Sequence, residues 1–503
     1  MESSTVSLEQ LQKKNTELQS EISYLREQLE WLKRQIFGQR SERIVETTHA
    51  DQLLLFDVPT ESPIEEDEPA PKKKRKKPKR DGKDAITLPD DLPVERQVID
   101  LAEEDKICPE TGKPLIKIGE DITQKIAHRP GSYFIKEIVR PKYASPYSTE
   151  IGVISALLPD TLLERCKADE CFLADILVKK FCDHLPLYRQ AEILSRQGIE
   201  ISRQLLSQWV VRCGEALKPL YNEMLRQVLQ SNNIFIDETP LDMLLPGNKK
   251  VHQAYMWVIA GGAEADPSYR FYTFRMNRQH KHVIDLLKDY QGFFHSDKYG
   301  AYEAFANRKQ ATWCPCYAHI RRKFFEAESG DPKLRKWILR KIRHLFMLER
   351  VAWNRSAEER LKIRQEKEIP IIDELIRMIQ DKLINGKILP KSKLKEALGY
   401  FLGLIPYLKS YTVDPWARLD NNVAERAVRP LAIGRKNWLF AGSEEGGEAA
   451  AVILTLVQSC RAVGVNPREY LEDVMRRLLS HSSKRLVELL PKQWFETRQQ
   501  STT

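Results

Sequence analysis

The stretch from residue 231 to 319 constrains the fold most strongly, because it concentrates short segments rich in aromatic and β-branched residues. Four of these segments predict strands: NNIFIDETP, AYMWVIAG, YRFYTFR and GFFHSDKYG. A helical segment, HKHVIDLLKDY, separates the third strand from the fourth, and WCPCYAH reads as a fifth strand that enters a helix. Three consecutive strands, a crossover helix and further strands predict an α/β core, with a mixed sheet covered by helices.

Acidic residues directly follow two of these predicted strands. Asp237 follows the apolar segment IFI and precedes a Thr-Pro stop, and Asp297 ends GFFHSD in the same way. Glu425 lies 128 residues beyond Asp297, in a segment that predicts a helix, and a helical insertion would account for that gap. Carboxylates brought together in this way bind hard divalent ions, and two such ions about 4 Å apart serve phosphoryl transfer. The three acids are therefore candidates for phosphodiester chemistry.

The alternative is that these are turn and surface acids, since the chain holds 71 acidic residues. Asp420, with the two asparagines that follow it, is better suited to capping a helix N-terminus, which would leave Glu425 one to two turns inside that helix. Rival carboxylates in the same segments are Glu238, Asp242, Asp289 and Asp420.

Residues 1–40 carry a different period, in which apolar residues recur every seven positions. One set holds Leu8, Asn15, Ile22, Leu29 and Ile36, and the other holds Leu11, Leu18, Leu25 and Leu32. Leucine throughout the second set predicts a coiled coil, and a buried Asn15 that must meet its own copy favours a parallel dimer. A single amphipathic helix packed on its own chain is the alternative.

Residues 41–100 predict a disordered charged linker, because proline is frequent and apolar runs are few. An acidic run precedes the segment KKKRKKPKR at 72–80, which holds eight positive charges. The net charge of the chain is +9, so the excess is local. This run would either contact DNA phosphates or solvate the linker.

Residues 101–155 predict a small β-rich domain that resembles a degenerate zinc finger. A zinc knuckle needs two pairs of cysteines, and only Cys108 is present. Thr111, Ser145 and Ser148 stand at the other positions, so we expect no zinc here.

Residues 156–230 predict helices that include a helix-turn-helix. Two apolar faces lie on either side of Gly198, which suits a sharp turn. The second helix would present Arg203 and Gln204 to DNA bases or phosphates. An ordinary helical hairpin fits the same pattern.

The rest of the chain divides into four parts. Residues 231–325 form the first part of the core, 326–410 a helical insertion with a basic segment at 333–343, 411–480 the second part of the core and 481–503 a C-terminal tail. Cys314, Cys316 and His319 have a spacing that a metal site would use, but packing is the favoured interpretation. His319 would alternatively lie near the active site.

The chain resembles the IS66 family of bacterial insertion-sequence transposases, a DDE group. The matching strings, in consistent order along nearly the whole chain, are IFGQRSER, DHLPLYRQ, IDETP, SDKYGAY, CYAHIRRKF and the block from Asp420 to Gly447. The resemblance implies that Asp237, Asp297 and Glu425 are the catalytic acids and metal ligands. It implies Mg²⁺ or Mn²⁺ as cofactor, with two ions, and transfer of transposon ends into target DNA. The strand order matches that group's RNase H-like core.

Partners follow from the same residues. DNA contacts are expected from Arg426 and Arg429, which suit phosphates, and from Arg435 and Lys436, which are alternatively salt-bridge partners. We expect a homodimer or higher oligomer, and relatives are usually encoded beside small accessory proteins. No apolar run is long enough for a membrane span and no signal peptide is evident, so a bacterial cytoplasmic protein associated with the nucleoid is expected. The alternatives are a non-catalytic DNA-binding regulator, a simple nuclease and an inactive transposase remnant.

Overall fold

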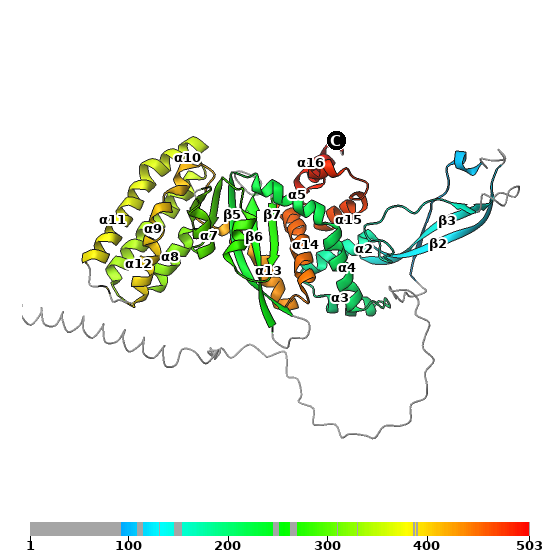
Figure 1. The fold of residues 1–503 in the computed structure, drawn as a ribbon, viewed down its shortest axis with the longest axis horizontal. Coiled ribbons are helices and arrows are strands. Elements are labelled where there is room, and N and C mark those ends of the chain that lie inside the picture. The colour runs from blue at the N-terminus through cyan, green and yellow to red at the C-terminus, as the bar shows by residue number, and fades with distance from the viewer. Residues whose placement is uncertain are drawn as a thin grey trace, which may run out of the picture.

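A computed structural model gives the fold of this protein. It describes residues 92–107, 114–129, 131–144, 153–244, 251–261, 269–308, 310–328, 330–385, 388 and 391–501. The coiled coil predicted for 1–40, the linker as far as 91 and the position of Cys108 lie outside the described residues. Two sheets and their helices form an elongated molecule, with a helical bundle at one end and a long β-hairpin at the other (Figure 1).

The N-terminal sheet is built around the hairpin of β2 (Ile116–Arg129) and β3 (Ser132–Ala144). Gly131 supplies the positive φ of the turn between them. β4 (Val153–Ser155) pairs antiparallel with β3, and β1 (Val94–Val98) pairs parallel with it. β1 lies inside the range expected to be linker, so the ordered sheet begins earlier than the sequence indicated. A 3₁₀ turn, η1 (Glu103–Lys106), follows β1.

Four helices follow: α2 (Glu170–Phe181), α3 (Leu187–Ser195), α4 (Arg203–Ala216) and α5 (Lys218–Leu229). The turn predicted at Gly198 separates α3 from α4, with φ at 76°. Ser202 caps α4 by accepting a hydrogen bond from the Leu205 N–H at 3.1 Å. The opposite side of α4 packs on a C-terminal helix so closely that a Cβ on Gly214 would lie 2.6 Å from the Ala449 Cβ. The other side of α4, which carries Arg203 and Gln204, remains exposed to solvent.

The central sheet has the strand order β7-β6-β5-β8-β9. β5 (Asn233–Leu244), β6 (Val251–Gly261) and β7 (Tyr269–Arg275) are antiparallel, whereas β8 (Phe293–Ser296) and β9 (Thr312–Pro315) continue parallel to β5. α6 (His280–Leu286) precedes β8, α7 (Gly300–Ala306) precedes β9, and α8 (Tyr317–Glu326) follows it. The α/β core and its mixed sheet are thus as predicted.

β5 is longer than the sequence indicated. The strand was expected to stop at Thr239-Pro240, but it continues to Leu244 in antiparallel register with β6. β8 pairs only with Asn233–Phe235, so on that side β5 has no paired strand at Pro240, and it meets only a single bridge, between Met243 and Ala441, further along. A proline is tolerated on such an unpaired edge, which explains why Pro240 does not end the strand.

The helical insertion contains α9 (Pro332–Ala352), α10 (Ala357–Ile363), the π-helical η2 (Arg364–Glu368), α11 (Ile369–Asn385), α12 (Lys393–Leu402) and the 3₁₀ turns η3 (Ile405–Tyr407) and η4 (Ser410–Val413). Arg364 is completely buried and pairs with Glu349 through two hydrogen bonds of 2.7 and 2.8 Å. The same guanidinium donates to the carbonyls of Tyr411, Asp414 and Ala417. All five donors of the side chain are thereby used, and the insertion is tied to the chain that leaves it.

The C-terminal part contains α13 (Asn422–Trp438), α14 (Glu444–Ala462), α15 (Pro467–Arg477), η5 (Ser483–Leu489) and α16 (Pro491–Ser501). The segment after 481 was expected to be a tail, but Leu489, Leu490 and Trp494 are buried in the main core. None of the described helices is long and apolar enough to cross a bilayer.

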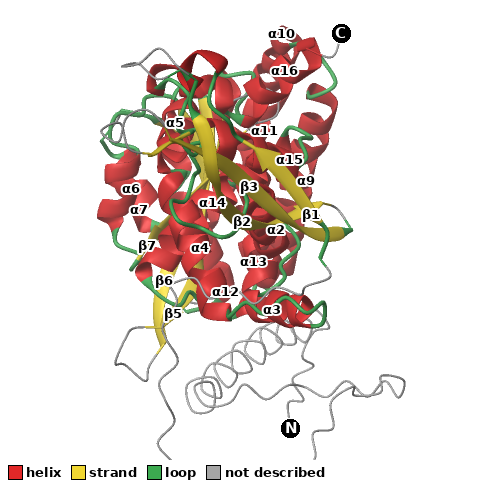
Figure 2. Ribbon diagram, turned by 90° about the vertical axis from the view of Figure 1, so that its right-hand side faces the viewer, coloured by secondary structure: helices red, strands yellow, loops and turns green. Residues whose placement is uncertain are grey.

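Helices cover both faces of the central sheet (Figure 2). The Tyr272 hydroxyl donates to the Ala427 carbonyl of α13, and Gly447 of α14 lies against the Phe274 ring. Phe271, which points the other way on β7, packs against the Tyr221 ring of α5 in a tilted arrangement. α13 and α5 therefore lie on opposite faces, and α14 runs along the outer edge of β7, where Thr455 and Ser459 accept hydrogen bonds from the N–H groups of Tyr272 and Arg270.

Glu368 provides a test of the buried polar network. Burial and then the neighbouring Glu349 raise the pKa of Glu368 to about 8, while a hydrogen bond from Tyr411 opposes the shift. A carboxyl with a raised folded-state pKa contributes stability that is present at low pH and is lost as the pH rises through 8. The free energy of unfolding of the wild type should therefore fall between pH 6 and 9, and Glu368→Gln should reduce that fall by about 2 kcal/mol. Denaturant titrations at pH 6 and pH 9 measure the free energy of unfolding of each protein. An equal decrease in the wild type and in Glu368→Gln would contradict the prediction.

Candidate active site

Asp237 faces the helix that begins at residue 422. Residues two apart on a strand share a face, so Asp237 lies on the same side of β5 as Phe235. Phe235 packs against Val423 and Ala424 in the first turn of α13. Asp237 is also two residues beyond the last β5 position that pairs with β8. It is not at a strand end, as its sequence context suggested, but it does lie where the parallel pairing ends.

Asp297 follows the last residue of β8 and points to the same region. His295 and Phe235 are register partners, and their rings stack with centroids 4.3 Å apart. Asp297 comes two residues after His295, as Asp237 comes two residues after Phe235. The Asp297 Oδ1 atom is buried and, among the described residues, accepts no hydrogen bond.

Glu425 lies in the first turn of α13, nearer the helix start than the sequence indicated. Asn421, completely buried, fixes that start by donating from its side chain to the Ile236 carbonyl at 2.8 Å. Its backbone N–H contacts the Cys316 Sγ at 3.2 Å. The Glu425 N–H bonds to the Asn421 carbonyl, so Glu425 lies one helical turn beyond the residue that anchors α13 to Ile236, the neighbour of Asp237.

The three acids are electrostatically coupled. Burial raises the pKa of Asp237 to about 8, and the charges of Glu238, Asp297 and Glu425 add to the shift. Burial likewise raises the pKa of Asp297, with a further contribution from Glu425 and an opposing one from Arg278. A bound cation would relieve this repulsion. The buried Asp297 Oδ1 and Glu425 Oε1 atoms also lack hydrogen-bond partners among the described residues. The repulsion and these two atoms make the carboxylate set suitable for a hard divalent ion.

The rival carboxylates have other surroundings. Glu238 points to the opposite face of the sheet, where Tyr302 and Arg278 donate hydrogen bonds to it, although burial and the charge of Asp297 raise its pKa. Asp242 is exposed, and the side chain of Asp289 is 86% exposed. Asp420 accepts from the N–H of Asn422, the first residue of α13, but the N-cap position itself is Asn421, whose side chain does not cap the helix.

Lys298, the cation that follows Asp297, turns toward the insertion. Its Nζ donates to the Tyr400 carbonyl at 3.3 Å, and its backbone N–H contacts the Tyr400 hydroxyl at the same distance. The loop that carries Asp297 is thus held by α12.

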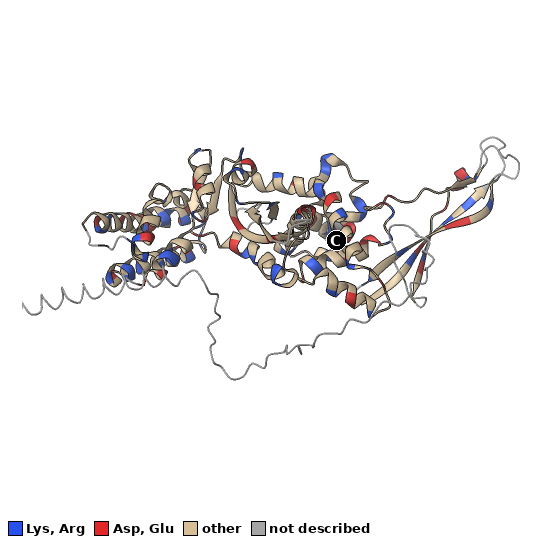
Figure 3. Ribbon diagram, turned by 60° about the horizontal axis from the view of Figure 1, so that its bottom comes forward, with Lys and Arg blue, Asp and Glu red and all other residues tan. Residues whose placement is uncertain are grey.

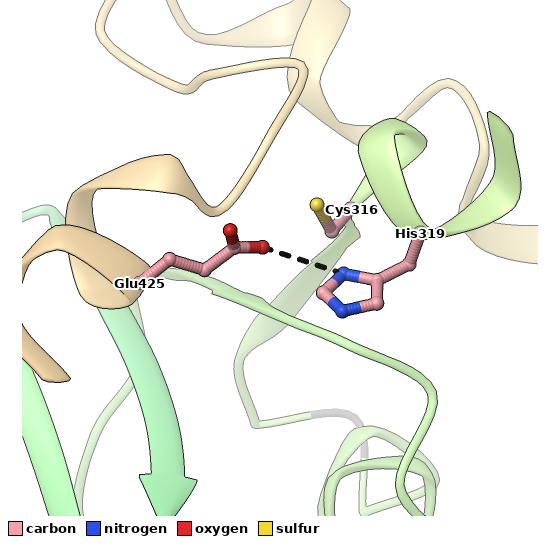
Figure 4. A group of neighbouring side chains, drawn as sticks. All are labelled: Cys316, His319 and Glu425. Atoms are coloured by element: carbon pink, nitrogen blue, oxygen red, sulfur yellow. Dashed lines mark ion pairs between the residues drawn. The ribbon is translucent and has the colours of Figure 1, made fainter. Parts of the chain in front are cut away.

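Cys314, Cys316 and His319 separate into two environments. Cys314 is buried in β9, in keeping with the packing role expected for it. Cys316 is the N-cap residue of α8, and His319 lies one turn further along that helix. The His319 Nδ1 is 3.7 Å from the Glu425 Oε1, and the ligand atoms of Cys316, His319 and Glu425 all lie within 4.8 Å of one another (Figure 4).

The residues expected to contact DNA are placed as follows. Arg426, Arg429 and Lys436 are exposed along one side of α13, and Arg203 and Gln204 are exposed at the start of α4. Arg435 instead turns inward and donates to the Thr239 Oγ1 at 2.8 Å and to the Pro240 carbonyl. Basic residues are also frequent on the helical insertion (Figure 3). Lys333, Lys336, Arg340 and Arg343 are exposed on one side of α9, since they are three or four residues apart.

Sequence reasoning missed the role of one residue at this site and named the position of another only as an alternative. Asn421 was assigned to a helix cap, although its side chain bonds to β5 rather than to α13. Packing was the favoured interpretation for His319 and a position near the active site the alternative, and the structure places it beside Glu425. The C-x-x-H spacing on a helix start was the available signal.

The sequence matches known families along most of its length. A sequence model described as "Transposase IS66 family" matches residues 165–449, and one described as "IS66 C-terminal element" matches residues 455–492. A third, "Transposase C of IS166 homeodomain", matches residues 24–96, nearly all outside the described residues. The first match spans the central sheet, the insertion and α13.

Three similar proteins come from Sinorhizobium fredii (strain NBRC 101917 / NGR234). "Uncharacterized protein y4qI" is 35% identical over 73% of this chain and 70% of its own length. "Uncharacterized protein y4jD" is 31% identical over 97% of this chain and 96% of its own, and "Uncharacterized protein y4hP" is 31% identical over 93% and 88%.

Divalent ions test the carboxylate set without any DNA. An ion that binds only the folded protein stabilises it, by about 2.7 kcal/mol at a hundred times its Kd. Mg²⁺ or Mn²⁺ should therefore raise the melting temperature of the wild type, and the increase should be smaller in Asp297→Asn. Asp289→Asn, which removes an exposed acid, is the matched control and should respond like the wild type in calorimetry. Equal increases in all three proteins would count against a metal at Asp297.

Proposed function

The chain belongs to the IS66 transposase family, and on that premise we propose that it is a DNA transposase whose catalytic acids are Asp237, Asp297 and Glu425. Family membership by itself indicates a transposase. The assignment of residues is carried by one observation: acids from β5, from the end of β8 and from α13 face one place, where burial and neighbouring carboxylates raise the pKa of Asp237 and of Asp297. A DNA-binding regulator would have no use for such a set.

We infer further that the central sheet is an RNase H-like core. The order β7-β6-β5-β8-β9, with three antiparallel strands followed by two parallel ones, supports this inference. In that arrangement the acids of neighbouring parallel strands meet at one edge of the sheet. The insertion between β9 and α13 then accounts for the long separation of Glu425 in sequence.

Asp237, Asp297 and Glu425 would hold magnesium or manganese, two ions in all. When bound, such ions promote attack of a hydroxyl or water on the phosphodiester and stabilise the leaving oxygen. Asn421 positions Glu425 by anchoring the start of α13 to the Ile236 carbonyl. The contacts of Lys298 with Tyr400 keep a cationic side chain turned toward α12 beside the Asp297 loop.

DNA would lie along the exposed cations. Arg426, Arg429 and Lys436 follow α13 outward from Glu425, and they are suited to phosphates. The helix-turn-helix of α3 and α4 would contribute Arg203 and Gln204. The coiled coil proposed for residues 1–40 would pair two protomers, which suits a reaction that brings two transposon ends together.

Cleavage and strand transfer on transposon-end DNA test the catalytic proposal. Asp237→Asn should abolish both activities, by about a thousandfold or more, because a metal-binding carboxylate is lost while the side-chain shape is kept. Asp289→Asn should retain wild-type rates. Equal activity in Asp237→Asn and the wild type would refute the assignment, and cleavage without joining would identify a nuclease. End binding with no product from the wild type would identify an inactive remnant.

DNA affinity measured over a range of salt concentrations tests the α13 cations. Arg429→Ala should weaken binding to all sequences alike and reduce the slope of log affinity against log salt by about one. Lys484→Ala, outside the proposed DNA path, is the control and should leave the slope unchanged. An unchanged slope in Arg429→Ala would exclude a phosphate contact at that residue.

A further inference from the structure

The second chemically distinctive feature of the site is the group of Cys316, His319 and Glu425. It offers one sulfur, one nitrogen and one oxygen atom, all within 4.8 Å of one another. Figure 4 shows the three side chains converging from two helices. Among the described residues this is the one group of three or more such side chains close enough to share an ion.

Two of the three ligand atoms lack any other partner. The His319 Nδ1 and the Glu425 Oε1 are buried, and neither has a hydrogen-bond partner among the described residues. They face each other at 3.7 Å, which is too long for a hydrogen bond. Buried polar atoms without partners are costly, so a pair of them pointing at each other requires an explanation. An ion between them would supply it.

The two helices that carry the ligands are fixed relative to each other. The Tyr317 N–H at the start of α8 bonds to the Leu419 carbonyl, and the Asn421 N–H contacts the Cys316 Sγ. Cys316 and His319 are three residues apart at the N-terminal end of α8, so both side chains lie on one side of it. Burial raises the pKa of the Cys316 thiol to about 12, so an ion would bind there by displacing the thiol proton. The ligands are thus held close together before any ion binds.

The ligand types select the ion. Magnesium prefers oxygen ligands only, and thiolate and imidazole are poor ligands for it. Zinc and cobalt accept sulfur, nitrogen and oxygen together, and three protein ligands plus one water form a common zinc arrangement. The carboxylate set of Asp237, Asp297 and Glu425 has the opposite preference. Glu425 belongs to both sets.

We propose that Cys316, His319 and Glu425 bind one zinc-like transition-metal ion, and that this ion inhibits the enzyme by withdrawing Glu425 from the magnesium set. Binding replaces the thiol proton of Cys316, which passes to water, with a sulfur–metal bond. The binding half of the proposal stands by itself, and the inhibitory half rests on the proposed transposase function. Zinc would then act against magnesium through a shared ligand.

Cobalt provides a direct reading of the binding site, because a thiolate bound to Co²⁺ gives a near-ultraviolet charge-transfer band. The full-length protein, without DNA, should develop this band when Co²⁺ is added and lose it when Zn²⁺ is added. Cys316→Ser should show no band, and His319→Ala should bind Co²⁺ about tenfold more weakly or worse. Cys314→Ser, two residues away and outside the group, and Cys108→Ser should both retain the wild-type band.

A band that persists in Cys316→Ser, or that disappears in Cys314→Ser or Cys108→Ser alone, would overturn the site. Circular dichroism of each variant shows whether it is folded. Should Cys316→Ser fail to fold, His319→Gln decides the matter, since a folded His319→Gln protein with wild-type cobalt affinity would exclude the site.

Zinc inhibition tests the second half. In strand-transfer assays with saturating Mg²⁺, micromolar zinc should inhibit the wild type, and Cys316→Ser should be inhibited much less relative to its own zinc-free rate. Equal inhibition of both would overturn the shared-ligand mechanism. A wild type without any transfer activity would refute the proposed function, while the cobalt spectra would still decide whether the metal site exists.

Discussion

The position of Glu425 depends on how residues 411–421 are held after the chain leaves the insertion. The buried guanidinium of Arg364 bonds to three carbonyls of this segment, and the carboxylate of Asp414 accepts hydrogen bonds from Asn232 and Asn233 at the start of β5. Further along, the Arg418 N–H bonds to His295 Nε2, and Asn421 bonds to β5. Every few residues, therefore, a directional bond connects the segment to a strand that carries an acid. This is how a carboxylate far away in sequence reaches the sheet.

Bringing Glu425 close to the acids of the sheet lowers the stability of the protein when no cation is bound. Burial and then the neighbouring carboxylates raise the pKa of Asp237 and of Asp297, which favours their protonated forms until a cation is present. The surrounding bonds offset this cost, because they are buried, directional and independent of the acids' own charge. The site is thus held in a geometry suited to a cation by the fold and not by attraction among its own members.

The sequence predicted the mixed sheet and the insertion because both depend on local patterns of strand and helix residues. It located Asp237 correctly on β5 but misjudged the strand's end, since the tolerance of β5 for Pro240 depends on β8 leaving that edge unpaired. For His319 the sequence offered a position near the active site only as an alternative, because its contact with Glu425 arises from two helices separated by the whole insertion. Arg435 illustrates the same limit: its charge suggested DNA, whereas its surroundings include a strand that accepts its hydrogen bonds. Local patterns of strand and helix residues could be predicted from the sequence, whereas contacts between distant segments could not.

The insertion is part of the site because it contacts the segments that carry two of the three acids. α12 holds the Asp297 loop through Tyr400 and Lys298, and η2 holds the approach to Glu425 through Arg364. Both contacts come from one bundle, so a displacement of that bundle on binding DNA would act on the two acids together. The exposed cations of α9 lie on this same bundle, and they would transmit the presence of a phosphate backbone to it. If DNA bound along α9, the Arg364 and Lys298 contacts would thus connect it to the carboxylate geometry at the sheet.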